Sequence, residues 1–244
     1  MYQLKGSRIF IAGGSSGIGF ATARLLASLD AEVIIASRNR ERLEKAAAEI
    51  KGKVSVIVFD AQNENECQKA LQKTGKIDHL VLTLSGGKGG GLFTSINALD
   101  LKAAFDAKFW AHFTMAKQSI PYLSEKGSIT FVTAISARAA NPGTSGLSAV
   151  NAAIEGLIKP LAVELKPRRI NAVSPGIIDT PWWNMYDEKM KETIFKQFAA
   201  QTPVGRIGKP EDVAEAIAFL TSNTFMTGAI IECDGGLHLT GSSL

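Results

Sequence analysis

The sequence is short of the residues that build disulfide frameworks and metal sites. Its 244 residues include only two cysteines and three histidines. Cys67 and Cys233 lie far apart in the chain, and neither belongs to a spacing pattern typical of a metal site. We therefore expect no disulfide, no bound metal and a reducing compartment, which favours a cytoplasmic protein.

Long apolar runs and dense charge are also missing. Residues 1–6 lead directly into a strand-like segment without a basic-then-apolar leader, and no apolar run approaches the ~20 residues of a membrane span. The 27 basic and 23 acidic residues give a net charge of +4, spread along the chain except for a cluster at Arg38 to Lys45. We therefore expect neither a membrane nor a nucleic acid as a partner.

Short β-branched segments alternate with amphipathic ones. The former predict seven buried strands, at Arg8 to Ala12, Glu32 to Ala36, Val54 to Phe59, His79 to Leu84, Ser128 to Thr133, Arg169 to Ser174 and Ala229 to Cys233. The latter predict helices, at Gly17 to Leu29, Arg40 to Ile50, Glu64 to Thr74, Leu99 to Leu123, Leu147 to Lys166 and Pro210 to Leu220. This alternation predicts an α/β, single-domain Rossmann fold over residues 1–244, a doubly wound parallel sheet of about seven strands with helices on both faces.

The least regular region covers residues 177–202. Pro181, Trp182 and Trp183 follow a predicted strand there and precede a charged stretch. Such a segment is typical either of a substrate flap or of a helical surface insertion without a gating role, and both interpretations stay open.

A glycine-rich turn joins the first predicted strand to the first helix. Glycines let the backbone turn tightly and approach a pyrophosphate, while free N–H groups and the helix dipole stabilise its charge. The sequence therefore predicts a dinucleotide site that includes Gly13, Ser15, Ser16, Gly17, Ile18 and Gly19.

The second strand ends without the acidic residue that would bind the ribose 2′-hydroxyl of NAD. Ser37 and Arg38 occupy this position instead. A guanidinium matches a 2′-phosphate in a bidentate way, so the cofactor predicted is NADP(H). Asp60 and Ala61 close the third strand, where the carboxylate could accept the adenine amino group.

With these motifs, the chain resembles the short-chain dehydrogenase/reductase family over nearly its full length. Asn171 to Thr180 and Pro203 to Ala214 are similar to two further family segments. The resemblance implies that Pro175, Gly176, Ile178 and Thr180, with Ser85 and Gly86 after the fourth strand, contact the cofactor. It also implies a homodimer or homotetramer.

The resemblance breaks at the catalytic residues. Family members ordinarily use Asn, Ser, Tyr and a Lys four residues after the Tyr. Alignment by strand and helix places Lys108, Ala134, Leu147 and Asn151 at these positions. Leu147 can neither donate nor accept a proton, so we expect an active site that lacks Tyr-x-x-x-Lys.

Two functions remain open at this point. The first is an NADP(H)-dependent oxidoreductase that acts on a small carbonyl, enone or imine-like substrate, with Lys108 as an acid or an electrostatic stabiliser and His112 one turn later on the same helix face. Ser136, Ser145 and Ser148 are candidates to bind the substrate oxygen, and Asn151 to bind a ribose hydroxyl. The second is a catalytically silent NADP(H)-binding sensor or structural subunit.

Overall fold

Seven parallel strands form one sheet in the computed structural model, which describes residues 4–240; residues 1–3 and 241–244 of the predicted domain lie outside the described residues. The sheet order is β3-β2-β1-β4-β5-β6-β7. The strands are β1 (Arg8–Ala12), β2 (Glu32–Ser37), β3 (Lys53–Val58), β4 (Ile77–Leu82), β5 (Leu123–Val132), β6 (Arg169–Pro175) and β7 (Ile230–Cys233). The predicted parallel α/β fold is therefore confirmed.

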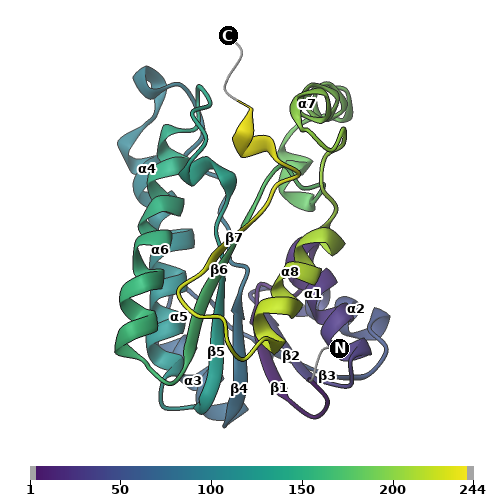
Figure 1. Cartoon of the computed structure of the whole chain (residues 1–244), viewed down its shortest axis with the longest axis vertical. Helices are drawn as coiled ribbons and strands as arrows, with labels where there is room; N and C mark the ends of the chain where they lie inside the picture. Colours follow the sequence, from purple (N-terminus) through teal and green to yellow (C-terminus); the bar gives the residue numbers. More distant parts are fainter. Residues whose placement is uncertain (1–3, 241–244) are drawn as a thin grey trace.

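Helices cover both faces of this sheet (Figure 1). One face packs against α1 (Gly17–Ser28), α2 (Arg40–Glu49) and α8 (Pro210–Ser222). The other packs against α3 (Glu64–Thr74), α5 (Ala111–Ser119) and α6 (Ser145–Glu164). Strand residues alternate between the two cores: Phe10 and Ala12 lie in one, and Ile9 and Ile11 in the other.

The strand order reverses between β1 and β4. From β1 the chain winds outward to β2 and β3, and it then returns to start the other half of the sheet at β4. In open parallel sheets, ligands bind at the carboxyl ends of the strands on either side of such a reversal. The β1–α1 turn and the segment after β4 meet there.

Several predicted element boundaries were wrong, including the start of the fifth strand, which is Leu123 rather than Ser128. Two of these errors have a clear physical cause. The fourth strand ends at Leu82 rather than Leu84, because its neighbour β1 ends at Ala12, whose carbonyl accepts from both the N–H and the Oγ1 of Thr83 at 2.9 Å. The long helix predicted to end at Leu123 ends at Ser119, since the chain turns at Pro121 and Leu123 starts β5. It also divides into α4 (Ala98–Ala104), a π-helical turn η2 (Phe105–Trp110) and α5.

Helix α6 has the length and apolar composition of a membrane span, alone among the helices of the described residues. Ile154 and Ile158 are fully buried in the core of the fold, and α6 packs along η3 (Ile135–Ala137) and β6. These contacts are those of a core helix. The remaining elements are η1 (Phe93–Ser95), η4 (Pro181–Met185), α7 (Glu188–Gln201) and η5 (Leu237–Leu239).

Candidate active site

A cleft of about 1030 Å³ opens at the carboxyl ends of the strands. Every residue predicted to bind the cofactor lines it, from the β1–α1 turn, the ends of β2 and β3, the segment after β4 and the end of β6. Lys108, Ser136 and Asn151 line the same cleft, while Ser145 and Ser148 do not. The structure thus brings together nearly all of the predicted site.

The glycine-rich turn is shaped by close backbone approaches. Gly13 has a φ of 95°, a conformation that favours glycine. A Cβ on Gly19 would overlap the Gly13 carbonyl oxygen and would lie 2.5 Å from Thr83 Oγ1. Ser16, the N-cap residue of α1, makes no side-chain cap hydrogen bond, so the first N–H groups of the helix face the cleft without a cap. This end of the cleft suits an anionic group.

A hydroxyl and two arginines lie where β2 ends. Ser37 Oγ is buried and has no hydrogen-bond partner, and Arg38 is exposed beside it. Arg42, which the sequence analysis missed, also lines this end of the cleft, whereas Arg40 pairs with Glu44 at 3.4 Å. Arg42 could have been found from its place in the basic cluster on the first turn of α2, the helix that follows β2.

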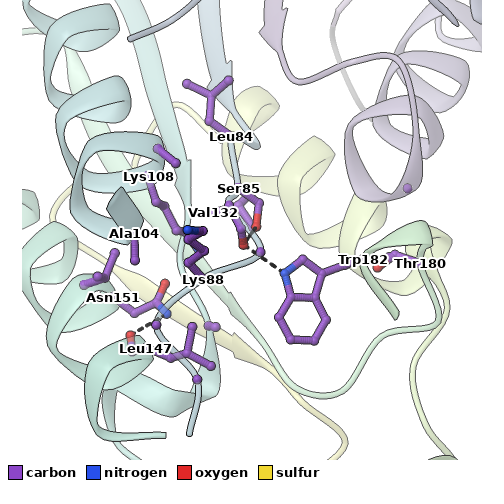
Figure 2. A pocket seen from close by; sticks show the side chains of 18 of the residues that line it. Leu84, Ser85, Lys88, Ala104, Lys108, Val132, Leu147, Asn151, Thr180 and Trp182 are labelled. Atoms are coloured by element: carbon purple, nitrogen blue, oxygen red, sulfur yellow. Dashed lines mark hydrogen bonds between the residues drawn. The ribbon is translucent and has the colours of Figure 1, made fainter. Parts of the chain in front are cut away.

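Lys108 lies at the opposite end, on the π-helical turn. Its Nζ donates to the Thr133 carbonyl oxygen at 3.2 Å, just beyond the end of β5. The residue is half-buried, and desolvation of the amine lowers the pKa of Lys108 to about 8. Single π-helical turns are frequent at functional sites, and this one aims an amine into the cleft (Figure 2).

Glu155 is a second charged group at this end that the sequence analysis missed. Thr133 Oγ1 donates to Glu155 Oε1 at 2.9 Å, so Thr133 joins the lysine to the carboxylate. Glu155 opposes the desolvation of the amine by raising the pKa of Lys108. Arg138 pairs with both Glu155, at 2.9 Å, and Glu232 on β7. Sequence spacing did not indicate this network, because its members lie on η2, α6 and β7 and in the segments that follow β5 and η3.

His112 does not act beside Lys108 as expected. It is fully buried, and its ring nitrogens lie 2.7 Å from the Lys108 carbonyl and 3.1 Å from the Leu82 carbonyl. Burial, with the nearby Lys108 charge, lowers the pKa of His112 to about 3, so the ring is neutral at physiological pH and donates to only one of these two carbonyls. Its role here is to join the helix to the end of β4.

Asn151 and Ser136 form a polar pair beside Lys108. Asn151 Nδ2 donates to Ser136 Oγ at 3.1 Å and to the Leu147 carbonyl at 2.9 Å, and its Oδ1 is buried without a partner. The Leu147 side chain is apolar and faces the cleft (Figure 2). Ser148 turns away, because its Oγ donates to the Thr144 carbonyl at 2.9 Å.

A glycine-rich segment and η4 enclose the lysine end of the cleft. Residues 86–91 contain five glycines and Lys88, whose Nζ pairs with Asp100 at 2.6 Å. Trp182 Nε1 donates to the Gly86 carbonyl at 3.0 Å and so joins η4 to this segment (Figure 2). The predicted flap region therefore contacts the opposite wall of the cleft.

One Tyr-x-x-x-Lys spacing does occur in the chain, at Tyr122 and Lys126. The Tyr122 carbonyl accepts from Ile77 N, which places the pair at the amino ends of β4 and β5. Neither residue lines the cleft. This spacing therefore supplies no group to the site.

Comparison with known proteins gives the family. A family model described as Enoyl-(Acyl carrier protein) reductase matches residues 12–238. The chain is 34% identical to 3-oxoacyl-(acyl-carrier-protein) reductase FabG of Rickettsia prowazekii, over 97% of this chain and 99% of that protein. The chain belongs to the short-chain dehydrogenase/reductase family. The family predicted from the sequence is confirmed.

Further similarities agree with this assignment to the short-chain dehydrogenase/reductase family. FabG of Thermotoga maritima is 35% identical over 96% of this chain and 99% of its own length. A crystal structure of a small-chain dehydrogenase in complex with NADPH is 30% identical, with a TM-score of 0.84 over 96% of this chain and 100% of that one.

Proposed function

We propose that this protein is an NADP(H)-dependent oxidoreductase that reduces a small carbonyl, enone or imine-like substrate, with Lys108 as the proton donor. The observation that carries the proposal is one continuous cleft, with an anion-binding turn at one end and a desolvated amine at the other. The cofactor supplies the hydride when bound. The protein supplies binding, orientation and the proton.

Two buried atoms without partners support a dinucleotide in this cleft. Ser37 Oγ lies at the arginine end, where a 2′-phosphate would accept from it, and Asn151 Oδ1 lies at the lysine end, where a ribose hydroxyl would donate to it. A buried polar atom without a partner costs about 1–3 kcal/mol, and a bound ligand removes that cost. NADPH offers complementary groups at both ends.

Lys108 is suited to general acid catalysis. With a pKa of about 8 it is mostly protonated at pH 7 and still gives up its proton readily. Ser136, held by Asn151 Nδ2 at 3.1 Å, offers a hydroxyl to the same substrate oxygen. These groups take the place of a tyrosine acid, because Leu147 presents only carbon to the cleft.

The function is tested by following NADPH oxidation against a panel of ketones, enones, imines and quinones. We expect turnover with at least one class, and NADPH bound more tightly than NADH. Equal affinities for the two cofactors would contradict the NADP(H) assignment. Bound NADPH without turnover across the panel would favour the silent sensor, for which the apolar Leu147 is the supporting observation.

We also propose that the protein acts in the cytoplasm as a homodimer or homotetramer. Both cysteines are free thiols, and the outer edge of β7 has no strand partner within the described residues. Phe225 is 98% exposed in the segment that leads into β7. Sedimentation analysis is expected to show a dimer or tetramer, and a monomer at micromolar concentration would contradict this proposal.

A further inference from the structure

We infer that the substrate is a flat, uncharged ring ketone or cyclic enone that stacks on the Trp182 indole, beside the backbone of residues 86–91. This inference rests on the proposed function and names the substrate class of the same site. Four features of the lysine end of the cleft carry it: a glycine-rich wall, a fixed indole, a partly covered apolar stripe and paired charges.

The first feature is the glycine wall. A Cβ on Gly86 would lie 2.8 Å from the Ala107 Cβ on η2, so a side chain there would collide with the helix. Gly89 has a φ of 94°, and its added Cβ would lie 3.0 Å from the Ala104 Cβ. The segment packs so closely on the helices that it presents mainly peptide planes to the cleft. The glycines of this surface leave room for a flat ring, and the one side chain of the segment, Lys88, is paired with Asp100.

The second feature is the orientation of Trp182. Its Nε1 is tied to the Gly86 carbonyl at 3.0 Å, and its ring meets the Trp183 ring edge to face, with centroids 4.9 Å apart. Trp183 is fixed in turn by a 2.9 Å hydrogen bond to the Ile178 carbonyl. The Trp182 indole is therefore held in place before a ligand arrives. A preorganised aromatic face favours stacking with a planar partner.

The third feature is an apolar stripe on α7. Ile194 and Phe198 are spaced by one helical turn and both line the cleft. No residue of α7 is fully buried, so this stripe is only partly covered by the protein. With Leu147 and Val150 on the opposite wall, the substrate space is bounded by carbon on two sides. An apolar ligand would cover these surfaces and gain from their burial.

The fourth feature is the pairing of charge. Lys88 and Asp100 neutralise each other at the rim of the cleft. Of the charged residues that line the described cleft, Arg38, Arg42 and Asp60 lie at the other end, which leaves Lys108 to face the substrate. A substrate carboxylate would therefore have only the catalytic amine as a partner, and an iminium cation would be repelled by it. Neutral carbonyl compounds avoid both problems.

The chemistry balances for such a substrate. The carbonyl carbon of the ketone accepts a hydride from NADPH, and the cofactor is thereby oxidised to NADP⁺. The carbonyl oxygen accepts a proton from Lys108. Solvent then returns a proton to the amine. The net reaction is ketone, NADPH and one proton to alcohol and NADP⁺.

Binding to the protein loaded with NADP⁺ tests the inference without any need for turnover. Calorimetry compares 1-indanone, a flat bicyclic ketone, with 2-nonanone, which has the same number of carbons in an open chain, and with S-acetoacetyl-N-acetylcysteamine, a thioester. We expect 1-indanone to bind about tenfold more tightly than either, as one stacked ring is worth about that factor. Tighter binding of 2-nonanone or of the thioester would overturn the inference.

Variants of Trp182 sharpen the test. Trp182→Ala is expected to weaken 1-indanone binding about tenfold and to change 2-nonanone binding less than threefold. Trp182→Phe keeps a ring and should restore part of the lost affinity, while Val163→Ala, at a residue on α6 that is 70% exposed and does not line the cleft, is the control. Unchanged 1-indanone binding in Trp182→Ala would overturn the inference. Selective binding without any turnover would support it and contradict the proposed function instead.

Discussion

The two ends of the cleft are built in different ways. At the β1–α1 turn the contacts come from backbone, with Gly13 and Gly19 packed against Thr83 and N–H groups left open at the helix start. At the other end the contacts come from side chains, with Lys108 joined through Thr133 to Glu155. The first arrangement depends on the absence of side chains. The second depends on which side chains different elements bring together.

The two ends of the cleft therefore have different roles: the glycine turn binds the cofactor, and the lysine end carries out the reaction. A backbone cradle can hold the pyrophosphate of any dinucleotide, so it is compatible with many reactions. The lysine end decides whether a reaction occurs and on what substrate. Substitutions at one end are therefore expected to leave the function of the other end largely intact.

The largest expected effect on cofactor binding is at Gly19. A methyl group there would overlap the Gly13 carbonyl oxygen, so Gly19→Ala must displace the turn that holds the pyrophosphate. We expect NADPH affinity to fall by about two orders of magnitude or more, as contacts to a charged group worth about 1.5–3 kcal/mol each are lost. Calorimetric titration measures this loss.

Gly156→Ala is the matched control for Gly19→Ala. No atom lies within 4 Å of an added Cβ at Gly156, which is exposed on α6. This variant should bind NADPH normally and gain about 0.5–1 kcal/mol in its free energy of unfolding. Full NADPH affinity in a folded Gly19→Ala variant would contradict the claim that the close-packed β1–α1 turn holds the pyrophosphate.

The next largest effect on NADPH affinity is expected at the arginine end of the cleft, where Arg38 and Arg42 lie. Arg38→Ala and Arg42→Ala are each expected to weaken NADPH binding about tenfold and to leave NADH binding unchanged, because only NADPH carries the 2′-phosphate. Arg40→Ala is the control, since Arg40 pairs with Glu44 and does not line the cleft. An equal loss of NADPH and NADH affinity would show that these residues do not bind the 2′-phosphate.

A smaller effect, on the pH dependence of kcat/KM, is expected from Glu155→Gln. The carboxylate raises the pKa of Lys108, so its removal should lower that pKa below about 8. Because the acid acts in its protonated form, kcat/KM for reduction falls as pH rises through this pKa. The variant should therefore lose activity at a pH lower by about half a unit to one unit.

Glu164→Gln, at an exposed position near the end of α6, is the control for this pH profile. Its profile should match that of the unmodified protein. An unshifted profile in Glu155→Gln would contradict the coupling of Glu155 to Lys108.

The fold and the binding end could be predicted from the sequence because their determinants are local. Strand alternation predicted all seven strands, and the glycine turn follows β1 directly in the chain. Ser37 and Arg38 were found from their position at the end of β2. The prediction erred where the end of an element depends on a neighbouring strand or on a proline, as at Leu82 and Pro121.

The lysine end could be predicted only in part. Lys108 and Asn151 were found through the family resemblance, but Glu155 and the Trp182 contact with Gly86 join segments far apart in the chain. Ser148 was misjudged as a cleft residue, because its place on the first turn of α6 did not reveal that its hydroxyl bonds to Thr144. Side-chain direction at a helix start is set by packing that spacing alone does not show.

The most direct test of the central claim measures cofactor binding and turnover together in Lys108→Met. We expect NADPH affinity within about threefold of the unmodified protein and turnover lower by about 10²–10⁴-fold. Lys108→Arg keeps the charge but not a proton that can be released, so it should also fail to turn over, while Lys102→Met, at an exposed position on α4, should be fully active. Unchanged turnover in Lys108→Met would contradict the account.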